Sequence, residues 1–250
     1  MEYASTHPTD TIIVDDDSYM VYVGSDSHLV GSSHNLTTFV QLYRSDNLCP
    51  VAIHLGDHVR GKTNLPLDAD TYSSIPANPT KRDTIFSTIG NHDLMYGQWT
   101  EYFRIWKTSV YWFVVSTPTY HDVFICLDNA SGTLGRSQIL WLNKLLAAFA
   151  EDPTIRHRIV YSHVDFFRMD NMMNNCANMP QEETYELIHM FEQYHVAQYW
   201  SGHDHCQEKV QIGNVIYIAV DALDDKLPEA GYMAVTMSDD IHNDFRRINQ

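Results

Sequence analysis

The stretch YMVYVGSDSH (residues 19–28) joins a short apolar run to Asp26 and His28, and this pairing recurs along the chain. The run from Tyr19 to Gly24 predicts a buried strand. A carboxylate and an imidazole two residues apart are ligand types that hard or borderline divalent metals accept, and in extended backbone both face one side. The stretch therefore predicts a strand whose end carries part of a metal site.

Four further segments carry the same polar groups, and they are Gly56-Asp57-His58, Gly90-Asn91-His92-Asp93, Ser162-His163 and Gly202-His203-Asp204-His205. Apolar runs before them predict strands over residues 51–55, 84–89, 158–161 and 197–200. Sites in α/β folds lie beyond the carboxyl ends of strands. We therefore expect the five segments to form one site, which holds more than one ion. A carboxylate such as Asp57 can bridge two ions, with one oxygen on each.

Helices are expected between the strands, because the apolar residues over 32–44, 98–106, 137–150 and 182–194 have helical spacing. A strand pair is expected over 110–116 and 123–127, and three strands near the end, two of them (208–212 and 215–220) forming a hairpin at Gly213-Asn214. Residues 61–80 contain three prolines and predict a long loop. The chain is thus expected to be an α/β protein with two mixed sheets flanked by helices, forming a single domain over 18–250 after a flexible tail over 1–17.

The chain of 250 residues is 44% hydrophobic, which is enough for one large core. Its formal charge of -16 disfavours binding to bulk nucleic acid. No apolar run has the length of a bilayer crossing, and residues 1–17 lack the charge and apolar pattern of a secretory signal. A cytoplasmic location is expected, or an extracytoplasmic one if a leader has been removed. The four cysteines are spaced like reduced thiols rather than a disulfide framework.

In order and spacing, the five segments resemble the calcineurin-like metallophosphoesterases, whose pattern is D-x-H, G-D, G-N-H-D/E, a lone His and G-H-x-H. The resemblance covers nearly the whole chain after the tail and implies a four-layer α/β/β/α sandwich. It also implies two metal ions, drawn from Mn, Fe or Zn. One ion would take Asp26, His28, Asp57 and His205, and the other would take Asp57, Asn91, His163 and His203.

The resemblance further implies hydrolysis of a small phosphomonoester or phosphodiester by a metal-bound hydroxide. His92 would assist the leaving group, and Asp93 is the nearest candidate to orient His92. Protein Ser/Thr phosphatases of this superfamily carry an Asp where this chain has Arg60, and they end the third block in Glu. Purple acid phosphatases carry a Tyr there and lack the His of the first block. The chain therefore resembles neither of these two branches.

Residues 56–63 also match the P-loop pattern G-x-x-x-x-G-K-T, which predicts a nucleotide-binding protein. The context disfavours this reading, because Pro66 follows where a helix should begin and Asp57 would repel a phosphate. Arg60, Lys62 and His58 remain candidates for contact with substrate.

Two further hypotheses concern the whole protein and one loop. The chain could be a metal-binding scaffold without turnover, although its intact ligand set disfavours that role. Residues 165–180 hold four of the ten methionines, and they could form a lid that faces substrate or a plain surface loop.

Overall fold

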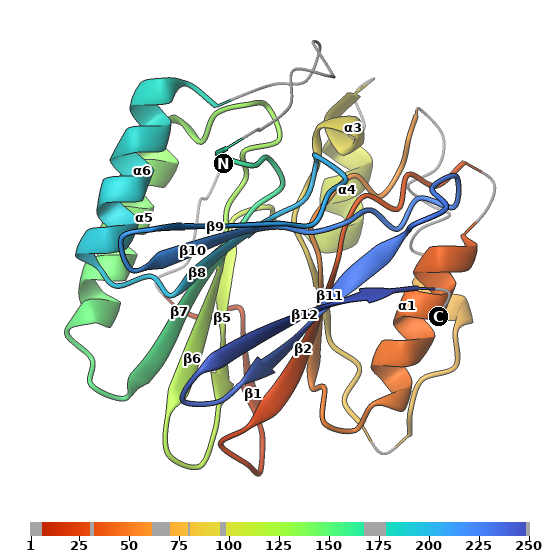
Figure 1. Cartoon of the computed structure of the whole chain (residues 1–250), viewed down its shortest axis with the longest axis horizontal. Helices are drawn as coiled ribbons and strands as arrows, with labels where there is room; N and C mark the ends of the chain where they lie inside the picture. The colour runs from red at the N-terminus through yellow and green to blue at the C-terminus, as the bar shows by residue number, and fades with distance from the viewer. Residues whose placement is uncertain are drawn as a thin grey trace.

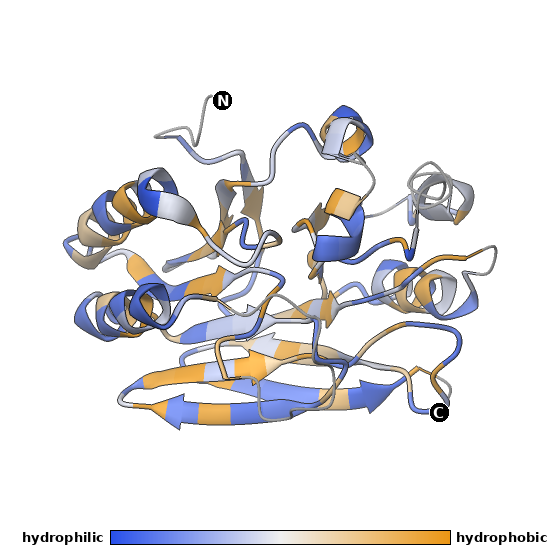
Figure 2. Cartoon of the chain, turned by 90° about the horizontal axis from the view of Figure 1, so that it is seen from above, coloured by the Kyte–Doolittle hydropathy of each residue, from blue (hydrophilic) through white to orange (hydrophobic). Residues whose placement is uncertain are grey.

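The structure is a computed structural model, and it describes residues 7–30, 33–61, 71–79, 81–95, 99–167 and 179–248. Two mixed β-sheets pack face to face, and helices cover their outer faces (Figure 1). Seen from above, the helices lie on both sides of the paired sheets (Figure 2). This arrangement confirms the expected α/β fold with four layers.

The smaller sheet contains the first three predicted strands. Its five strands run in the order β12 (Ile241–Arg247), β11 (Gly231–Met237), β2 (Tyr19–Gly24), β3 (Val51–His54) and β4 (Ile85–Ser87). Strands β2, β3 and β4 are parallel, whereas β11 runs antiparallel to β2 and to β12. The carboxyl ends of β2, β3 and β4 consequently share one edge.

The larger sheet has seven strands in the order β1 (Asp10–Ile13), β5 (Tyr111–Ser116), β6 (His121–Cys126), β7 (Ile155–Tyr161), β8 (Gln198–Ser201), β10 (Val215–Ala219) and β9 (Glu208–Ile212). Strands β6, β7, β8 and β10 are parallel. The predicted pair β5–β6 and the hairpin β9–β10 are antiparallel, as expected.

The main core fills the space between the two sheets. It includes Val21 and Ile53 from the smaller sheet and Phe124 and Trp200 from the larger one, all of them fully buried. These side chains alternate with residues that face the helices, which is the period of two that a strand imposes. Burial of both faces explains why the strands read as continuous apolar runs in the sequence.

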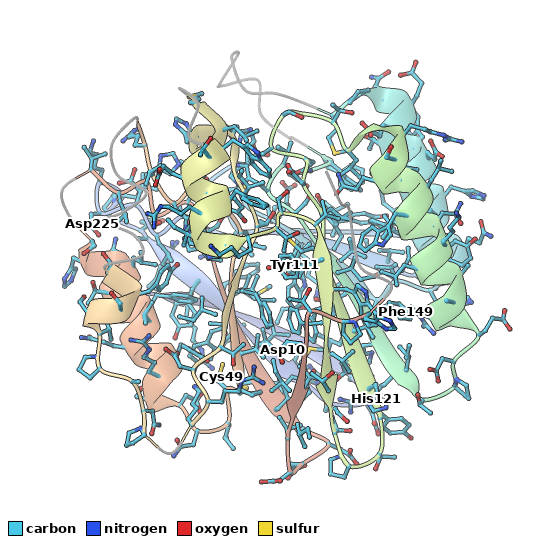
Figure 3. All side chains as sticks on the ribbon, turned by 180° about the vertical axis from the view of Figure 1, so that it is seen from behind. Asp10, Cys49, Tyr111, His121, Phe149 and Asp225 are labelled. Carbon is cyan, nitrogen blue, oxygen red and sulfur yellow. The ribbon has the colours of Figure 1, made fainter. Side chains whose placement is uncertain are left out.

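Helices seal the outer faces. On the smaller sheet, α1 (His34–Ser45) buries the apolar side chains of Leu36, Phe39, Val40 and Tyr43, which lie within the helix expected over 32–44. On the larger sheet, α5 (Gly135–Ala150) and α6 (Gln181–Gln193) pack side by side. Phe149 points from α5 toward the sheet (Figure 3), where its ring centroid lies 4.9 Å from that of Trp112.

The structure corrects three details of the predicted elements. Residues 10–13 are not part of a flexible tail but form β1, which pairs in parallel with β5 and buries Ile12. The end of the chain contributes four strands, β9 to β12, rather than three. Residues 71–74, within the predicted loop, form a helical turn.

Cys49 and Cys126 are buried free thiols, as expected of reduced cysteines. Within the described ranges, no helix combines the length and the apolar character needed to cross a membrane.

Candidate metal centre

The five polar segments meet at one edge of the sandwich, because each follows a parallel strand. Asp26 and His28 follow β2, and Asp57 follows β3. Asn91 is the first residue of the short helix α3 (Asn91–Leu94), which follows β4. The larger sheet contributes His163 after β7 and both His203 and His205 after β8. The structure thus brings the seven predicted ligands together from both sheets.

The first group consists of Asp26, His28 and His205, whose ligand atoms lie within 4.8 Å of one another. Asp26 Oδ1 is 3.4 Å from His28 Nε2 and 3.2 Å from His205 Nε2. The other carboxylate oxygen of Asp26 accepts hydrogen bonds from the Ser25 hydroxyl and from the backbone N–H of His203, at 2.5 and 2.8 Å. These bonds leave Oδ1 directed at the two imidazoles.

The second group consists of Asp57, His163 and His203, again within 4.8 Å. His163 Nε2 lies at its middle, 3.3 Å from Asp57 Oδ2 and 3.2 Å from His203 Nδ1. Asn91 Oδ1 joins this group at 3.0 Å from His163 Nε2. The two groups correspond to the two predicted ligand sets.

Asp57 lies between the two groups. Its Oδ2 is 3.4 Å from His28 Nε2 in the first and 3.3 Å from His163 Nε2 in the second. Its Oδ1 accepts a hydrogen bond of 2.7 Å from the backbone N–H of His92. The structure therefore differs from the expectation that each oxygen serves one ion, since a single oxygen faces both groups.

The donor atoms fit a divalent cation. Ligands held about 2.0–2.2 Å from one ion lie roughly 3 Å apart, as these atoms do. His163 Nδ1 is 2.7 Å from the Leu55 carbonyl, which can only accept, so this nitrogen carries the ring proton. In the neutral ring, Nε2 then presents a lone pair toward the oxygens of Asp57 and Asn91. Acceptors that face acceptors across 3 Å require a cation, or a proton, between them.

The pKa values of the carboxylates and imidazoles at this site indicate the same excess of negative charge. Burial opposes ionisation of Asp26, but the neighbouring His205, followed by His28 and His163, holds its pKa well below the usual range. Burial likewise opposes ionisation of Asp57, and His163 and His28 nevertheless lower its pKa. In return, despite burial, the two carboxylates raise the pKa of His28 to about 10 and that of His163 to about 9. A cation here would replace protons that the imidazoles otherwise hold.

The backbone at the site is unusual. Seven non-glycine residues of the described chain have positive φ, and five of them are proposed ligands, namely Asp26, His28, Asp57, His203 and His205, with φ between 46° and 70°. The left-handed region is uncommon for any residue other than glycine, although Asp and His enter it more often than most. Such residues cluster where function, rather than local preference, sets the backbone.

Two motif glycines are required by close packing against the carboxylates. A Cβ on Gly90 would lie 2.1 Å from Asp57 Oδ1, and a Cβ on Gly202 would lie 1.8 Å from Ser25 Oγ and 2.6 Å from Asp26 Oδ2. Both positions therefore exclude any side chain while Asp26 and Asp57 keep their places.

His92 is not one of the seven predicted ligands, but one of its ring nitrogens lies within 4.8 Å of the ligand atoms of His28 and Asp57, so these three residues form a further candidate metal group. His92 Nε2 is 4.0 Å from Asp57 Oδ2, and its ring centroid is 4.8 Å from that of His28. Its Nδ1 is 3.3 Å from the Arg60 carbonyl. The side chain is 27% exposed, so Nε2 can reach a bound molecule.

The structure corrects the prediction that Asp93 orients His92. Asp93 Oδ2 accepts hydrogen bonds from the backbone N–H groups of Gly90 and Asp57, at 2.8 and 3.0 Å, and Oδ1 accepts one from Val59 at 3.3 Å. Consecutive residues of a helix point in different directions, so Asp93 turns back onto the helix start while His92 faces the site. Asp93 therefore holds the Asp57 loop in place.

The predicted substrate contacts have different outcomes. His58 is fully buried, stacks between His54 and Trp106 with centroid distances of 4.0 and 4.6 Å, and lies 2.5 Å from Ser87 Oγ, so it does not line the site. The Arg60 side chain is 44% exposed and pairs with Asp224 at 3.4 Å. Lys62 lies outside the described residues, as does most of the predicted lid over 165–180.

Among the contacts that orient the ligands, sequence reasoning missed the Leu55 carbonyl on His163 and the Ser25 hydroxyl on Asp26. A backbone carbonyl has no sequence signature. Ser25, in contrast, stands directly before Asp26 in the first motif and could have been considered as its partner.

Comparisons with known proteins agree with this geometry. A family model described as calcineurin-like phosphoesterase matches residues 19–207. No curated protein matches the chain at a significant level. Among solved structures, a dimetal phosphatase from Danio rerio is similar, with 11% identity, coverage of 93% of this chain and 97% of that one, and a TM-score of 0.68.

Two other solved structures are similarly close. GAP50 of Plasmodium, described as the anchor in the inner membrane complex, has 12% identity, coverage of 93% and 85%, and a TM-score of 0.68. The purple acid phosphatase PPD1 from yellow lupin has 13% identity, coverage of 94% and 52%, and a TM-score of 0.67. At such identities the likeness concerns the fold alone.

Proposed function

Because the chain belongs to the calcineurin-like phosphoesterase family, we propose that it is a dinuclear metal-dependent phosphoesterase that hydrolyses a small phosphomonoester or phosphodiester. One observation carries the proposal. A single carboxylate oxygen, Asp57 Oδ2, lies 3.4 Å from His28 Nε2 in one ligand group and 3.3 Å from His163 Nε2 in the other. Two ions bound about 3.5–4 Å apart need such a shared ligand.

The proposed ligand sets follow the two groups. Asp26, His28, Asp57 and His205 would hold one ion, and Asp57, Asn91, His163 and His203 the other. When bound, such ions lower the pKa of a coordinated water and neutralise phosphate oxygens. Mixed imidazole and carboxylate donors accept Mn, Fe or Zn, and the donor set does not favour one of them.

His92 is the proposed general acid, because its exposed Nε2 faces the site while the Arg60 carbonyl lies 3.3 Å from Nδ1. This contact fixes the ring and places the proton of the neutral form on Nδ1. An imidazolium at His92 would donate its Nε2 proton to the leaving oxygen and then return to the neutral form. Arg60, which is bound to Asp224 by a single contact of 3.4 Å, is free to turn toward a phosphate oxygen.

A cavity beside the first ligand group gives a substrate room. It has a volume of about 510 Å³ and is lined by His205, Gln207, Asp221 and Arg247, among others. Cavities of roughly 300–1,000 Å³ hold small ligands. The cavity is lined by carboxylates and by Arg247, which is paired with Asp221 at 2.7 Å. Its surface is therefore not strongly cationic. The cavity therefore offers room for the organic part of a small substrate, while the charge of its phosphate would have to be met by the proposed ions.

Metal analysis and turnover together test the proposal. Purified protein should bind two ions per chain when loaded with Mn, Fe, Zn or Co, and it should hydrolyse generic phosphomonoesters or phosphodiesters. Asp57→Asn should disturb both ions, because Asp57 contacts both groups. His92→Ala should keep its metal content and lose about 100-fold or more in kcat. His189→Ala, an exposed histidine on α6, is the matched control and should change neither.

Three outcomes would contradict parts of this function. Absence of turnover by protein with both ions bound would refute the enzyme assignment. Parental activity in His92→Ala would remove the role of His92. Tight nucleotide binding that does not depend on metal would instead favour the P-loop reading, although Asp57 already contacts His28 and His163 where that loop would hold phosphate.

A scaffold without turnover is the other candidate, since the similar Plasmodium protein is described as an anchor. The seven donor groups and His92 disfavour this alternative, because a scaffold has no need of converging carboxylates with lowered pKa values. Ion binding without hydrolysis of any phosphoester would support it.

A further inference from the structure

A buried asparagine that belongs to none of the five motifs holds the backbone of one proposed ligand. Asn129 lies three residues after β6 and is fully buried. Its Oδ1 accepts hydrogen bonds from the backbone N–H groups of His163 and Val164, at 3.1 and 2.9 Å. Its Nδ2 donates to the Val164 carbonyl at 2.9 Å and to the Tyr199 hydroxyl at 3.4 Å. One side chain thus binds three backbone groups, the N–H of His163 and both the N–H and the carbonyl of Val164.

These hydrogen bonds lie where β7 ends and its ladder with β6 stops. The last backbone contact between these strands is Leu127 N–H to the Tyr161 carbonyl, at 2.9 Å. Beyond it, the N–H groups of His163 and Val164 would be buried without a strand partner. Only an acceptor can serve two N–H groups, so the amide oxygen of Asn129 must face them. The asparagine therefore extends the sheet by two residues and fixes the direction in which His163 leaves it.

Two other hydrogen bonds hold His163 in place, in addition to those from Asn129. The Leu55 carbonyl lies 2.7 Å from ring Nδ1, and the His163 carbonyl accepts a hydrogen bond of 3.0 Å from Gly202 N–H. The ring contact sets the rotation of the imidazole but leaves the position of its Cα free. The contacts from Gly202 and Asn129 fix the backbone on either side, so that Nε2 stays 3.3 Å from Asp57 Oδ2.

The contacts of Asn129 lie on one side of the centre. It touches the backbone of His163, which belongs to the second ligand group, and its hydrogen bonds do not involve Asp26, His28 or His205 of the first. We propose that Asn129 is a positioning residue for one ion only, the one assigned to Asp57, Asn91, His163 and His203. This inference rests on the proposed dinuclear centre.

Metal binding to the metal-free protein tests the inference without any measurement of turnover. Groups that orient metal ligands typically contribute about 10–100-fold to affinity. Asn129→Ala should therefore weaken one of the two binding steps by about 10–100-fold and leave the other within about threefold. Isothermal titration with Mn resolves the steps, and the metal content after dialysis at an intermediate free Mn concentration should fall from two ions to one. Asn143→Ala, an exposed asparagine on α5 bonded to Tyr194, should behave as the parent.

Double variants identify which ion is lost. Asn91→Ala alone should retain one ion, and so should Asn91→Ala combined with Asn129→Ala, because both changes act on the same group. His205→Ala alone should also retain one ion, whereas His205→Ala with Asn129→Ala should retain almost none. The reverse pattern, or an equal weakening of both steps in Asn129→Ala, would overturn the inference.

Asn129→Asp keeps the inference testable if the alanine variant does not fold. The carboxylate still accepts from the N–H groups of His163 and Val164 but cannot donate to the Val164 carbonyl. Its loss of affinity should be smaller than that of alanine and should again fall on one step. A parent that binds no ion would refute the dinuclear function itself. A parent with two ions and an Asn129→Ala variant with two unchanged affinities would overturn this inference alone.

Discussion

Replacing Gly202 by alanine should separate the geometry of the site from the stability of the fold. The added Cβ would lie 1.8 Å from Ser25 Oγ and 2.6 Å from Asp26 Oδ2, and Cβ atoms do not approach other atoms to within 3.0 Å. The two segments must therefore move apart by more than about 1 Å, since carbon contacts are favourable only near 3.5–4.0 Å. Asp26 is displaced in the process, because the Ser25 hydroxyl and the His203 N–H fix its second oxygen.

The expected magnitudes follow from that displacement. Overpacking of this kind costs about 1–3 kcal/mol, and the reduced freedom of the unfolded chain returns about 0.4–1 kcal/mol. The net cost is thus at most about 2.6 kcal/mol, and thermal unfolding of the metal-free protein should shift down by up to roughly 10 °C, at about 2–4 °C per kcal/mol for a chain of this size. A misplacement of about 1 Å can cost 100-fold in rate. Turnover should fall accordingly, and the first-group ion should bind about 10–100-fold more weakly.

Gly61→Ala is the matched control, because a Cβ at Gly61 would meet nothing within 4 Å. It should leave the unfolding temperature, the metal affinities and the turnover near their parental values. The assays are calorimetry in the presence of a chelator, metal titration, and phosphate release. If Gly202→Ala bound both ions with parental affinity, the close approach of Gly202 to the Asp26 carboxylate would not control the site, and our account of that glycine would be refuted.

Three further predictions concern protons, a backbone anchor and the far end of the sandwich. In the metal-free protein His28 and His163 have pKa values of about 10 and 9 and are protonated at pH 7, so bound ions must displace both protons. The combined affinity should therefore rise by up to about 100-fold per pH unit toward pH 9, with proton release measured by titration in several buffers, and a flat profile from pH 6 to 9 would contradict it. Asp93→Asn should cost about 1–3 kcal/mol, seen in urea unfolding, because the amide oxygen can keep the bonds from Gly90 and Asp57 while the Val59 N–H loses its acceptor. Tyr19→Phe removes the buried hydrogen bond of 2.8 Å to Asp122 and should cost about 1–2 kcal/mol without changing metal affinity; reduced metal affinity would show that the two ends of the sandwich are coupled.

Strands and ligands could be predicted from the sequence where a single local pattern indicates both of them. The run from Tyr19 to Gly24 is buried on both faces, so its apolar character survives in the sequence, and Asp26 follows it directly. Strand β1 was missed because it has four residues and only Ile12 is buried, while Ile13 is 80% exposed. Its position depends on β5, a hundred residues away, and no local pattern reports such a partner.

Within the site, sequence patterns predicted which side chains converge but not how they are held. The spacing of His92 and Asp93 could not show that one faces the site while the other caps its own helix. His58, next to Asp57, is directed into the core by the turn that directs Asp57 to the site. Asn129 carries no motif, because its function lies in backbone contacts that only the folded chain creates.

The left-handed backbone at the proposed ligands has a consequence for how this protein can change. Positions of this kind cost about 1–3 kcal/mol each, so five of them use an amount comparable with the net stability of about 5–15 kcal/mol of a typical domain. Glycine at Asp26, His28 or His205 would relieve that cost and also abolish a donor. Selection for heat resistance alone should therefore replace ligands of the proposed metal centre before it changes the core. The more stable protein obtained in that way would have lost its metal site.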